Sequence, residues 1–269
     1  MRVILILIII ILVIYIYRMV KDIEIKFKNY KKTRKVSKFI YINRPKQIEK
    51  NTKIAVIVPY RDNPIQNRKA HLRQFLNYFK SYLSKFNYKI FIIEQSDDGN
   101  KFNRGKLLNI GLKMAIDQGY DNLITHDVDL LPNDELLPFY TNIFDIPIHI
   151  AHRWSKYKYG NYFGGIVSFT KEMVMKFNGY PNDFWGWGGE DDSLYNRITE
   201  NMGKIGKPNV GKIKDLHHEE TKKDKRNKKK WENILDDLEN WKSNGINNLN
   251  FNLLKKNEDN NVGIYTVKI

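Results

Sequence analysis

Apolar residues recur along this chain with two spacings, one typical of strands and one typical of helices. Three short β-branched runs predict buried strands at Lys53–Pro59, Tyr88–Ile93 and Asn122–Thr125. Apolar positions at helical spacing between these runs predict helices at Asn67–Leu83 and Arg104–Gln118. This alternation of strand and helix indicates a doubly wound α/β sheet. Downstream, the pattern predicts a strand at Tyr162–Phe169 and a helix at Asp191–Met202.

The N-terminal residues follow a different pattern. Val3 to Tyr17 are all apolar, and Arg18 ends the run. As a helix the run would be about 22 Å long, against a hydrocarbon core of about 30 Å, and snorkelling of Arg18 would extend it to Val20. Bulky residues after the run argue against a cleaved signal peptide, and the lack of a polar face argues against a buried core helix. We therefore expect a signal anchor that spans the membrane.

The rest of the chain divides by composition. The anchor is expected at residues 1–21, a basic stem with little periodicity at 22–52, a globular domain at 53–242, and an Asn- and Lys-rich tail at 243–269. Of the 269 residues, 42% are hydrophobic and 13% aromatic, which is enough for one core and excludes disorder over most of the length. The net charge of +16 fits phosphate-bearing ligands, anionic membranes or nucleic acid.

Two aspartates follow the third predicted strand. Asp127 and Asp129 come directly after Asn122–Thr125, at the carboxyl end where such sheets bind ligands. Paired oxygen ligands suit a hard divalent cation, and a nucleoside diphosphate needs such a cation to screen its charge. A solvated turn is the alternative for an isolated Asp-x-Asp.

The segment Phe184–Asp192 (FWGWGGEDD) combines two Trp, three Gly and three acidic residues. Such a composition suits neither a core strand nor a core helix, because three Gly leave the backbone free at an entropic cost. Trp faces can stack on sugar rings, and adjacent carboxylates suit a general base beside hydrogen bonds to an acceptor. The alternative is a Gly-rich loop with the Trp rings packed beneath it.

Two further segments carry candidate ligand-binding residues. Asp215, His217 and His218 form a His–carboxylate cluster of the kind that completes a Mn²⁺ or Zn²⁺ site. They lie in a basic stretch, residues 212–230, that suits a loop closing over a diphosphate. Arg104 and Lys106 lie near a predicted helix start, where they suit a phosphate or uracil contact. A solvated loop and an ordinary helix start are the alternatives.

Together these segments resemble the β-1,4-galactosyltransferase family, which has the GT-A fold, a Rossmann-like nucleotide-sugar domain. Four blocks occur in the family's order over roughly residues 54–226: VPYR with NRKAHL, FNRGKLLNIG, DVDLLP, and YFGG followed by NGYPNDFWGWGGEDD. The resemblance implies an inverting, Mn²⁺-dependent enzyme. It would move galactose from UDP-galactose to a sugar hydroxyl in a β-1,4 linkage, with the catalytic domain at residues 53–242.

The resemblance also implies roles for individual residues. Asp191 would be the general base, and Tyr162 would favour galactose over N-acetylgalactosamine. Residues expected to contact the donor are Pro59, Tyr60, Arg61, Arg68, Phe102, Arg104, Lys106, Asp127 and Trp187. Residues expected at the acceptor are Tyr159, Tyr162, Gly188, Glu190 and Asp192. The chain departs from the family at residues 62–66, an insertion between PYR and NRKAHL.

The resemblance makes Asp129 a Mn²⁺ ligand but leaves the second metal segment open. Family members have Met-x-x-His or His-x-His there, and this chain has Asp215-Leu216-His217-His218. Alignment on His-x-His selects Asp215 and His217, whereas alignment on Met-x-x-His selects Asp215 and His218. We expect His217 to bind the metal, with Asp215 in place of the other ligand.

Membrane side and substrates stay open on the sequence alone. The family implies a Golgi-type lumenal, type II arrangement, whereas the basic flank after the anchor and the absence of Cys favour a cytoplasmic face. The expected acceptor is a glycan ending in GlcNAc, xylose or glucose. Alternatives are transfer of GalNAc or glucose on the same scaffold, and an inactive or basic binding protein. The FWGWGGEDD segment argues against nucleic acid as the partner.

Overall fold

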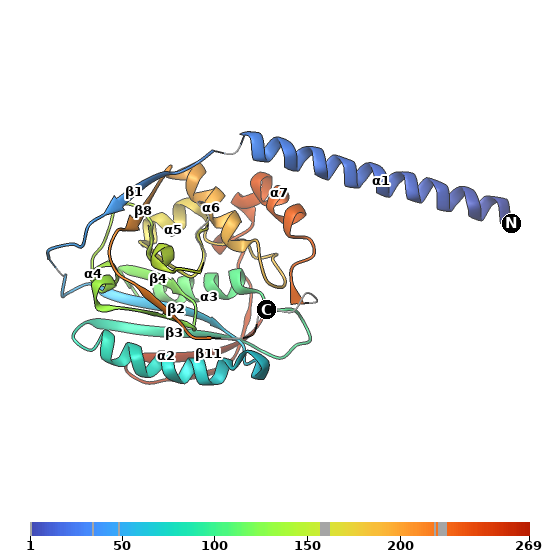
Figure 1. The fold of residues 1–269 in the computed structure, drawn as a ribbon. Coiled ribbons are helices and arrows are strands. Elements are labelled where there is room, and N and C mark those ends of the chain that lie inside the picture. The colour runs from blue at the N-terminus through green and yellow to red at the C-terminus, as the bar shows by residue number, and fades with distance from the viewer. Residues whose placement is uncertain (1, 34, 48, 157–161, 218, 220–224) are drawn as a thin grey trace.

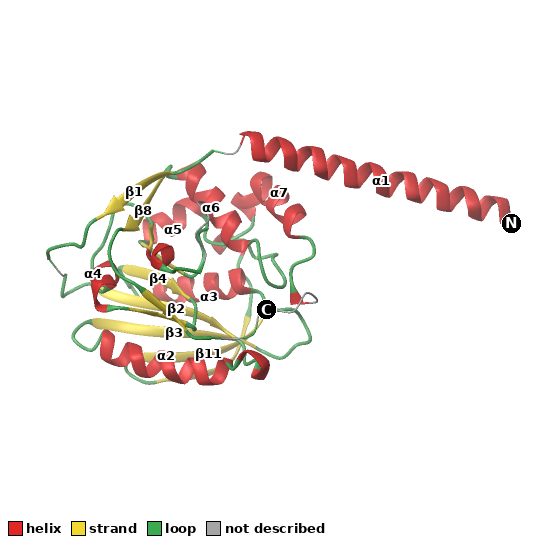
Figure 2. Ribbon diagram, in the orientation of Figure 1, coloured by secondary structure: helices red, strands yellow, loops and turns green. Residues whose placement is uncertain are grey.

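A nine-stranded mixed sheet forms the centre of the molecule, with helices on both faces (Figures 1 and 2). The structure is a computed structural model that describes residues 2–33, 35–47, 49–156, 162–217, 219 and 225–269. The strand order is β1-β8-β6-β7-β4-β2-β3-β11-β10, and β5 and β9 form a separate two-stranded sheet.

The strands are β1 (Lys38–Ile42), β2 (Lys53–Tyr60), β3 (Asn87–Gln95), β4 (Asn122–His126), β5 (Leu130–Pro132), β6 (Ile148–His149), β7 (Ile166–Phe169), β8 (Lys204–Pro208), β9 (Ile213–Asp215), β10 (Asn252–Glu258) and β11 (Val262–Lys268). The α-helices are α1 (Arg2–Thr33), α2 (Arg68–Tyr82), α3 (Arg104–Asp117), α4 (Pro138–Thr141), α5 (Lys171–Phe177), α6 (Glu190–Asn201) and α7 (Lys230–Asn240).

Strand β2 shows why the sheet is covered on both faces. Its side chains alternate between faces because the strand repeat is two residues. One set packs in a core cluster with Phe75 and Phe79 of α2, and consists of Ile54, Val56 and Val58. The other set packs with residues of α3, α5 and α6, and consists of Ala55 and Ile57. A strand buried on both faces reads as a continuous apolar run, which is the pattern that the sequence shows.

The predicted α/β core is confirmed. Strand β2 pairs in parallel with both β3 and β4, and β4 pairs antiparallel with β7. The chain therefore leaves β2 on one side through α2 and returns to the other side through α3. This reversal makes a topological switch point beyond the carboxyl end of β2, where open α/β sheets bind ligands. The predicted strand at residues 162–169 is shorter than expected, because Gly165 has a left-handed φ of 82° and β7 begins only at Ile166.

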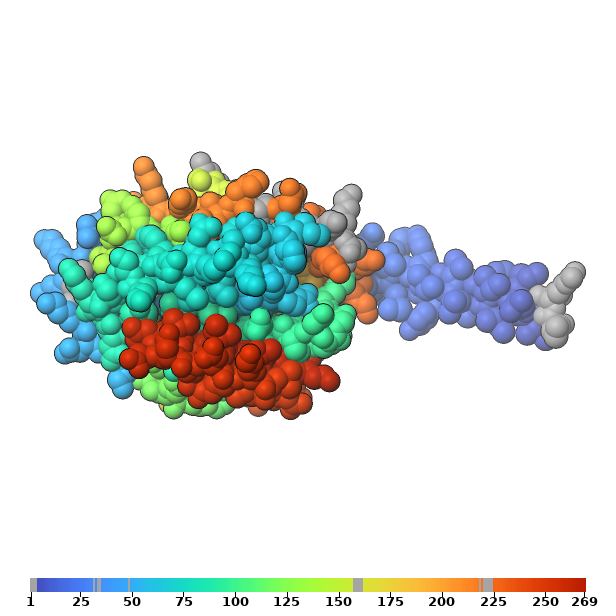
Figure 3. Space-filling view, turned by 90° about the horizontal axis from the view of Figure 1, so that it is seen from below, coloured from blue at the N-terminus to red at the C-terminus, as the bar shows by residue number. Residues whose placement is uncertain are grey.

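The sequence predicts a stem at residues 22–52 and a tail at residues 243–269, and both predictions miss strands of the sheet. The stem contains β1, which pairs in parallel with β8 at an edge of the sheet, and α1 continues as a helix to Thr33. The tail contains β11, which pairs in parallel with β3, and β10, which forms the other edge. Figure 3 shows these C-terminal residues in red on the surface beside the cyan residues of α2. The sheet therefore extends beyond both ends of the predicted domain.

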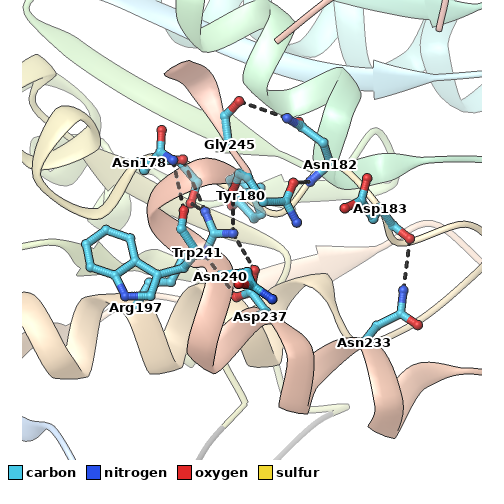
Figure 4. Close-up of polar contacts among 12 residues, drawn as sticks. Asn178, Tyr180, Asn182, Asp183, Arg197, Asn233, Asp237, Asn240, Trp241 and Gly245 are labelled. Carbon is cyan, nitrogen blue, oxygen red and sulfur yellow. Dashed lines mark hydrogen bonds and ion pairs between the residues drawn. The ribbon is translucent and has the colours of Figure 1, made fainter. Parts of the chain in front are cut away.

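A buried ion pair joins α6 to α7 (Figure 4). The Arg197 guanidinium donates to the Asp237 carboxylate at 3.0 and 2.5 Å, and to the backbone oxygens of Asn178 and Gly179 at 3.2 and 3.0 Å. Asn182 Nδ2 donates to Gly245 O at 2.8 Å, which adds the segment after α7 to the network. Residues 178–183 directly precede FWGWGGEDD, so this network fixes the start of that segment.

We predict that Asp237→Ala destabilises the fold strongly. Arg197 and Asp237 have side chains only 1% and 3% exposed, so the variant leaves an uncompensated buried charge, at a cost of about 3–5 kcal/mol. Urea unfolding of the detergent-solubilised full chain gives the free energy of unfolding, and its decrease in the variant measures this loss of stability. Asp117→Ala is the matched control: its pair with Lys113 is 57% and 46% exposed, and its loss should cost less than about 0.5 kcal/mol. Equal effects of the two variants would contradict the prediction.

Candidate active site

A pocket of about 380 Å³ lies at the carboxyl ends of β2 and β4 and against the N-terminus of α6. Most of the residues selected from the sequence line it. These are Pro59, Tyr60, Arg61, Arg68, Phe102, Arg104, Asp127, Asp129, Tyr162, Trp187, Gly188, Glu190, Asp191 and Asp192. The chain thus brings the predicted donor and acceptor residues together at the switch point of the sheet.

Arg104 joins three elements at the base of the pocket. Its Nε and Nη2 donate to Asp127 Oδ1 at 2.9 and 2.7 Å, and its Nη1 donates to Glu190 Oε1 at 3.4 Å. Arg104 begins α3, Asp127 follows β4, and Glu190 begins α6. Burial disfavours the charge of Arg104, but Asp127 and Glu190 outweigh it and hold the pKa of the guanidinium above its ordinary value. The structure thus shows Arg104, predicted as a donor contact, holding two acids together.

Asp191 differs from the other carboxylates of the pocket. Asp127 and Glu190 pair with Arg104, Asp129 pairs with Arg68, and Asp192 pairs with Lys230. Within the described part of the chain, no ion pair holds Asp191. Burial, with the charges of Glu190 and Asp192 beside it, raises the pKa of Asp191 to about 7. A carboxyl group with a pKa near neutrality is suited to accept a proton as a general base.

The absence of a side chain at Gly164 makes room for the Asp191 carboxylate. A Cβ at Gly164 would lie 2.6 Å from Asp191 Oδ2 and 3.0 Å from the Tyr162 hydroxyl oxygen. The other oxygen, Asp191 Oδ1, accepts from the backbone N–H of Asp192 at 3.0 Å. The YFGG segment therefore sets both the space around Asp191 and the position of Tyr162.

Trp187 lies where the FWGWGGEDD segment meets the basic stretch. Its backbone N–H donates to Lys225 O at 3.0 Å, and its O accepts from Asn227 N–H at 3.0 Å, which makes a parallel β-bridge with Arg226. Its indole is 55% exposed, and the Arg226 guanidinium lies 5.6 Å from the ring centroid. The exposed ring and the basic stretch therefore form one wall of the pocket.

An adjoining wall comes from the end of β2 and the residues just before α3. Arg61 Nη1 donates to Asn100 O at 2.8 Å, and its guanidinium lies 5.5 Å from the centroid of the Phe102 ring. The Phe102 carbonyl accepts from the Gly186 N–H at 2.8 Å, which connects this wall to the Trp-containing segment. Burial and the nearby Asp62 raise the pKa of the Tyr60 phenol to about 12, so it stays a neutral hydrogen-bond donor.

The described candidate metal ligands lie on or beside the paired strands β5 and β9. Leu130 of β5 pairs with Asp215 of β9, and Leu216 N–H donates to Asp129 O at 2.8 Å. Among the described residues, Asp215 Oδ1 is buried without a hydrogen-bond partner. The other oxygen, Asp215 Oδ2, lies 3.5 Å from Lys156 Nζ. An unsatisfied carboxylate oxygen is a suitable ligand for a hard divalent cation. The described residues hold no group of three His, Asp or Glu side chains close enough for a complete site, and His217 is exposed.

Of the predicted residues that the structure describes, three do not line the pocket: Lys106, Asp215 and His217. The Lys106 ammonium points elsewhere and donates to Asn250 Oδ1 at 3.1 Å, so the structure does not support its predicted donor contact. Tyr159 and His218 lie outside the described residues. Arg68, predicted to contact the donor, lines the pocket and pairs there with Asp129 at 2.7 Å.

Among the pocket-lining residues that sequence reasoning missed are Lys230 and Trp154. Lys230 Nζ lies 2.6 Å from Asp192 Oδ2; burial disfavours its charge, but Asp192 outweighs this and raises the pKa of Lys230. The available signal was its position at the start of a helix, which separates it from the other lysines of residues 212–230. Trp154 packs 6.1 Å from Tyr162, measured between ring centroids, and gave no signal beyond being a Trp among polar residues.

Two family models match the chain. The N-terminal region of glycosyl transferase group 7 matches residues 15–141, and the N-terminal domain of galactosyltransferase matches residues 147–219. β-1,4-Galactosyltransferase 1 of Mus musculus is 35% identical over 219 residues, which are 78% of this chain and 53% of that protein. β-1,4-Galactosyltransferase 3 of Cricetulus griseus is 37% identical over 223 residues, 79% of this chain and 54% of that protein. The chain spans about half the length of the curated relatives it matches.

Solved structures match the fold as well. The catalytic domain of Drosophila β1,4-galactosyltransferase 7 in complex with xylobiose has a TM-score of 0.69 at 31% identity, over 81% of this chain and 94% of that chain. A mutant of that protein in complex with manganese, UDP-Gal and xylobiose has a TM-score of 0.66 at 31% identity, with the same coverage. The sheet and its pocket are therefore those of the GT-A fold. On these matches the chain belongs to the β-1,4-galactosyltransferase family.

We predict that Arg104→Gln lowers the stability of the fold in a pH-dependent way. At about pH 8 the variant leaves Asp127 and Glu190 charged without their cation, at a cost of about 3 kcal/mol. Burial already raises the pKa of both carboxyls above their ordinary values, and the loss of Arg104 raises them further, so the cost shrinks as pH falls and the carboxyls take up protons. Urea unfolding at about pH 8 and pH 5 measures the difference. Arg73→Gln, an exposed position on α2, should show no such change with pH.

Proposed function

We propose that this protein is an inverting galactosyltransferase, which moves galactose from UDP-galactose to a sugar hydroxyl. The observation that carries the proposal is Asp191, the pocket carboxyl with a pKa of about 7, beside a cavity lined by Trp187 and Tyr162. Family membership supports it, as does the match to a relative whose structure holds manganese, UDP-Gal and xylobiose. We propose the segment from β1 to β11 as the catalytic unit, in place of residues 53–242.

The chemistry follows from the residues around Asp191. An acceptor hydroxyl beside Asp191 gives its proton to the carboxylate while its oxygen attacks the anomeric carbon of the donor. The bond between that carbon and the diphosphate oxygen breaks, and UDP leaves with the electron pair. Attack from the face opposite UDP inverts the configuration. Glu190 and Asp192 flank the base and are placed to accept hydrogen bonds from sugar hydroxyls.

The donor diphosphate meets the cationic side of the pocket. Arg61, Lys101 and Lys225 line it, and Trp187 can cover the donor together with the segment to which it is bridged. We infer that Mn²⁺ is held by Asp129 and Asp215, with His217 or His218 as a further ligand. The ion supplies Lewis-acid screening of the leaving diphosphate. Binding of the ion would compete with the pairs Arg68–Asp129 and Lys156–Asp215, and a released Arg68 guanidinium could bind a phosphate.

The finer assignments rest on the family. Tyr162, which stands beside Gly164 at the pocket wall, is proposed to favour galactose over N-acetylgalactosamine. The α1 stretch Ile4–Tyr30 is long and apolar enough to cross a membrane by length and composition. We propose a type II, lumenal arrangement, and protease protection of the domain in sealed vesicles tests it. Digestion without detergent would place the domain on the cytoplasmic face, which the basic flank favours.

We expect the full chain with Mn²⁺ to release UDP from UDP-galactose only when a suitable acceptor is present. GlcNAc, xylosides and glucosides form the panel, and coupled detection of UDP is the measurement. Asp191→Asn should lower turnover by about 100-fold or more, because it removes the general base. Asp183→Asn is the matched control, because this exposed acid lies in the same loop outside the pocket. No turnover with any acceptor would sink the proposed function.

The pH dependence of turnover should report the charge around Asp191. Because the base must be unprotonated, the rate should fall below about pH 7, by about tenfold per pH unit at the acid end. The Lys230 ammonium lowers the pKa of Asp191, so Lys230→Met should move this acid limb to higher pH. Lys229→Met, an exposed neighbour, should leave the limb in place. A limb that does not move in Lys230→Met would contradict this electrostatic account.

A further inference from the structure

Helix α1 has a face that packs against the globular part of the molecule. In the segment after Tyr17, Ile23, Phe27 and Tyr30 are partly buried, whereas the neighbours Glu24 and Lys28 are exposed. Spacings of four and three residues place these side chains on one side of a helix. The segment that the sequence analysis described as a stem with little periodicity therefore has a helical docking stripe, Ile23–Phe27–Tyr30.

The stripe contacts α7 and α6. The ring centroids of Phe27 and Trp231 are 4.3 Å apart, and the Tyr30 hydroxyl donates to Asn196 Oδ1 at 2.8 Å. Lys35 Nζ forms an ion pair with Glu200 at 2.8 Å just beyond the helix. Trp231 directly follows Lys230, and Asn196 lies on the helix whose first residues are Glu190, Asp191 and Asp192. The docking stripe thus contacts the two helices that carry the acceptor end of the pocket.

The contacts continue until the chain enters the sheet. The hydroxyl oxygens of Ser37 and Thr199 are 2.7 Å apart, and Ser37 N–H donates to the Tyr195 hydroxyl at 3.2 Å. From Lys38 to Ile42 the chain is β1, in register with β8. Contacts with the globular part therefore recur along the described residues between Ile23 and Ile42, and these residues do not form a free linker.

The position of the membrane follows from the charges on α1. The helix remains apolar to Tyr17, and Arg18, Lys21, Asp22 and Glu24 follow. These charges place the hydrocarbon edge between Tyr17 and Val20, so Phe27 lies about 10–15 Å beyond it along the helix. The headgroup layer takes up about 5–8 Å of this distance. Figures 1 and 3 show α1 leaving the domain beside α7 and projecting well beyond it. The docking contact at Phe27 therefore lies about 2–10 Å outside the headgroup layer.

We propose that residues 18–33 and 35–42 are a rigid mount, which holds the domain next to a membrane surface that contains anionic lipids. The exposed cations of the mount that face this layer are Arg18, Lys21, Lys26 and Lys28, and they outnumber the acids Asp22 and Glu24. Cations within a Debye length of about 8 Å attract anionic headgroups. The mount fixes the height of the pocket above the bilayer, whatever reaction the pocket performs.

The absence of Cys allows the mount to be tested by paired labels. Spin labels on Asp22→Cys and Glu239→Cys, both exposed, report the distance from α1 to α7 in the full chain in lipid nanodiscs. A rigid mount gives one narrow distance distribution by pulsed electron paramagnetic resonance. Phe27→Ala with Tyr30→Ala should broaden it, as should Trp231→Ala from the other side of the contact. Ile25→Ala, an apolar truncation on the exposed face, should leave it narrow. If the distance distribution is as broad in the chain without these substitutions as in the variants that carry them, the proposal of a rigid mount is overturned.

The lipid contact is tested separately with a fluorophore on Glu239→Cys and an energy acceptor on the lipid headgroups. Nanodiscs with phosphatidylserine should give more efficient energy transfer from the fluorophore than nanodiscs of phosphatidylcholine alone. Replacing Lys21, Lys26 and Lys28 with Gln should remove that difference, whereas Lys85→Gln on the domain surface should not. Transfer that is equal in both lipids and unchanged by the triple variant overturns the role of anionic lipid, even where the labels on α1 and α7 show a narrow distance.

Discussion

The pocket depends on one buried cation, Arg104. Several carboxylates lie at one end of the sheet, and such a cluster cannot stay charged in a site shielded from water unless cations compensate it. Arg104 compensates Asp127 and Glu190 at once, and in doing so it ties the start of α3 to the end of β4 and the start of α6. The position of the first residue of α6, and of Asp191 after it, follows from this contact.

The ion pairs of these acids with nearby cations then give the acids different chemical roles. Carboxylates that share a cation are held in ion pairs, and their oxygens suit hydrogen bonding to hydroxyls or binding of a metal. Asp191 lies between Glu190 and Asp192, and burial together with the charges of these two neighbours raises its pKa to about 7. Two carboxyl groups one residue apart thus take different roles because of their surroundings. Lys230 adjusts this difference, because it neutralises Asp192 while it lowers the pKa of Asp191.

Local patterns predicted the core, and long-range pairing decided the rest. Residues from β2 to β4 followed strand and helix periodicity, so their predicted bounds lie within a residue or two of those observed. Strand β1 is short and pairs with β8, more than 160 residues later, so no local pattern identifies its partner. For the site, the strand ends placed Asp127 and Asp129 correctly. The partners of Arg68 and Arg104 depend on which acids the fold brings near them, and residue type alone could not show that these cations hold acids.

Helix α7 brings the separate parts of the molecule together. Near its end, Asp237 forms an ion pair with Arg197 of α6, and at its start Lys230 forms one with Asp192. Trp231 packs against Phe27 of α1. Movement of α7 would therefore disturb a buried ion pair, a carboxylate of the acceptor end, and the contact with the membrane helix together. Because breaking the buried pair is costly, α7 and α6 act as one rigid body. The membrane helix, docked on that body, is then positioned relative to the pocket by the same ion pair that stabilises the fold.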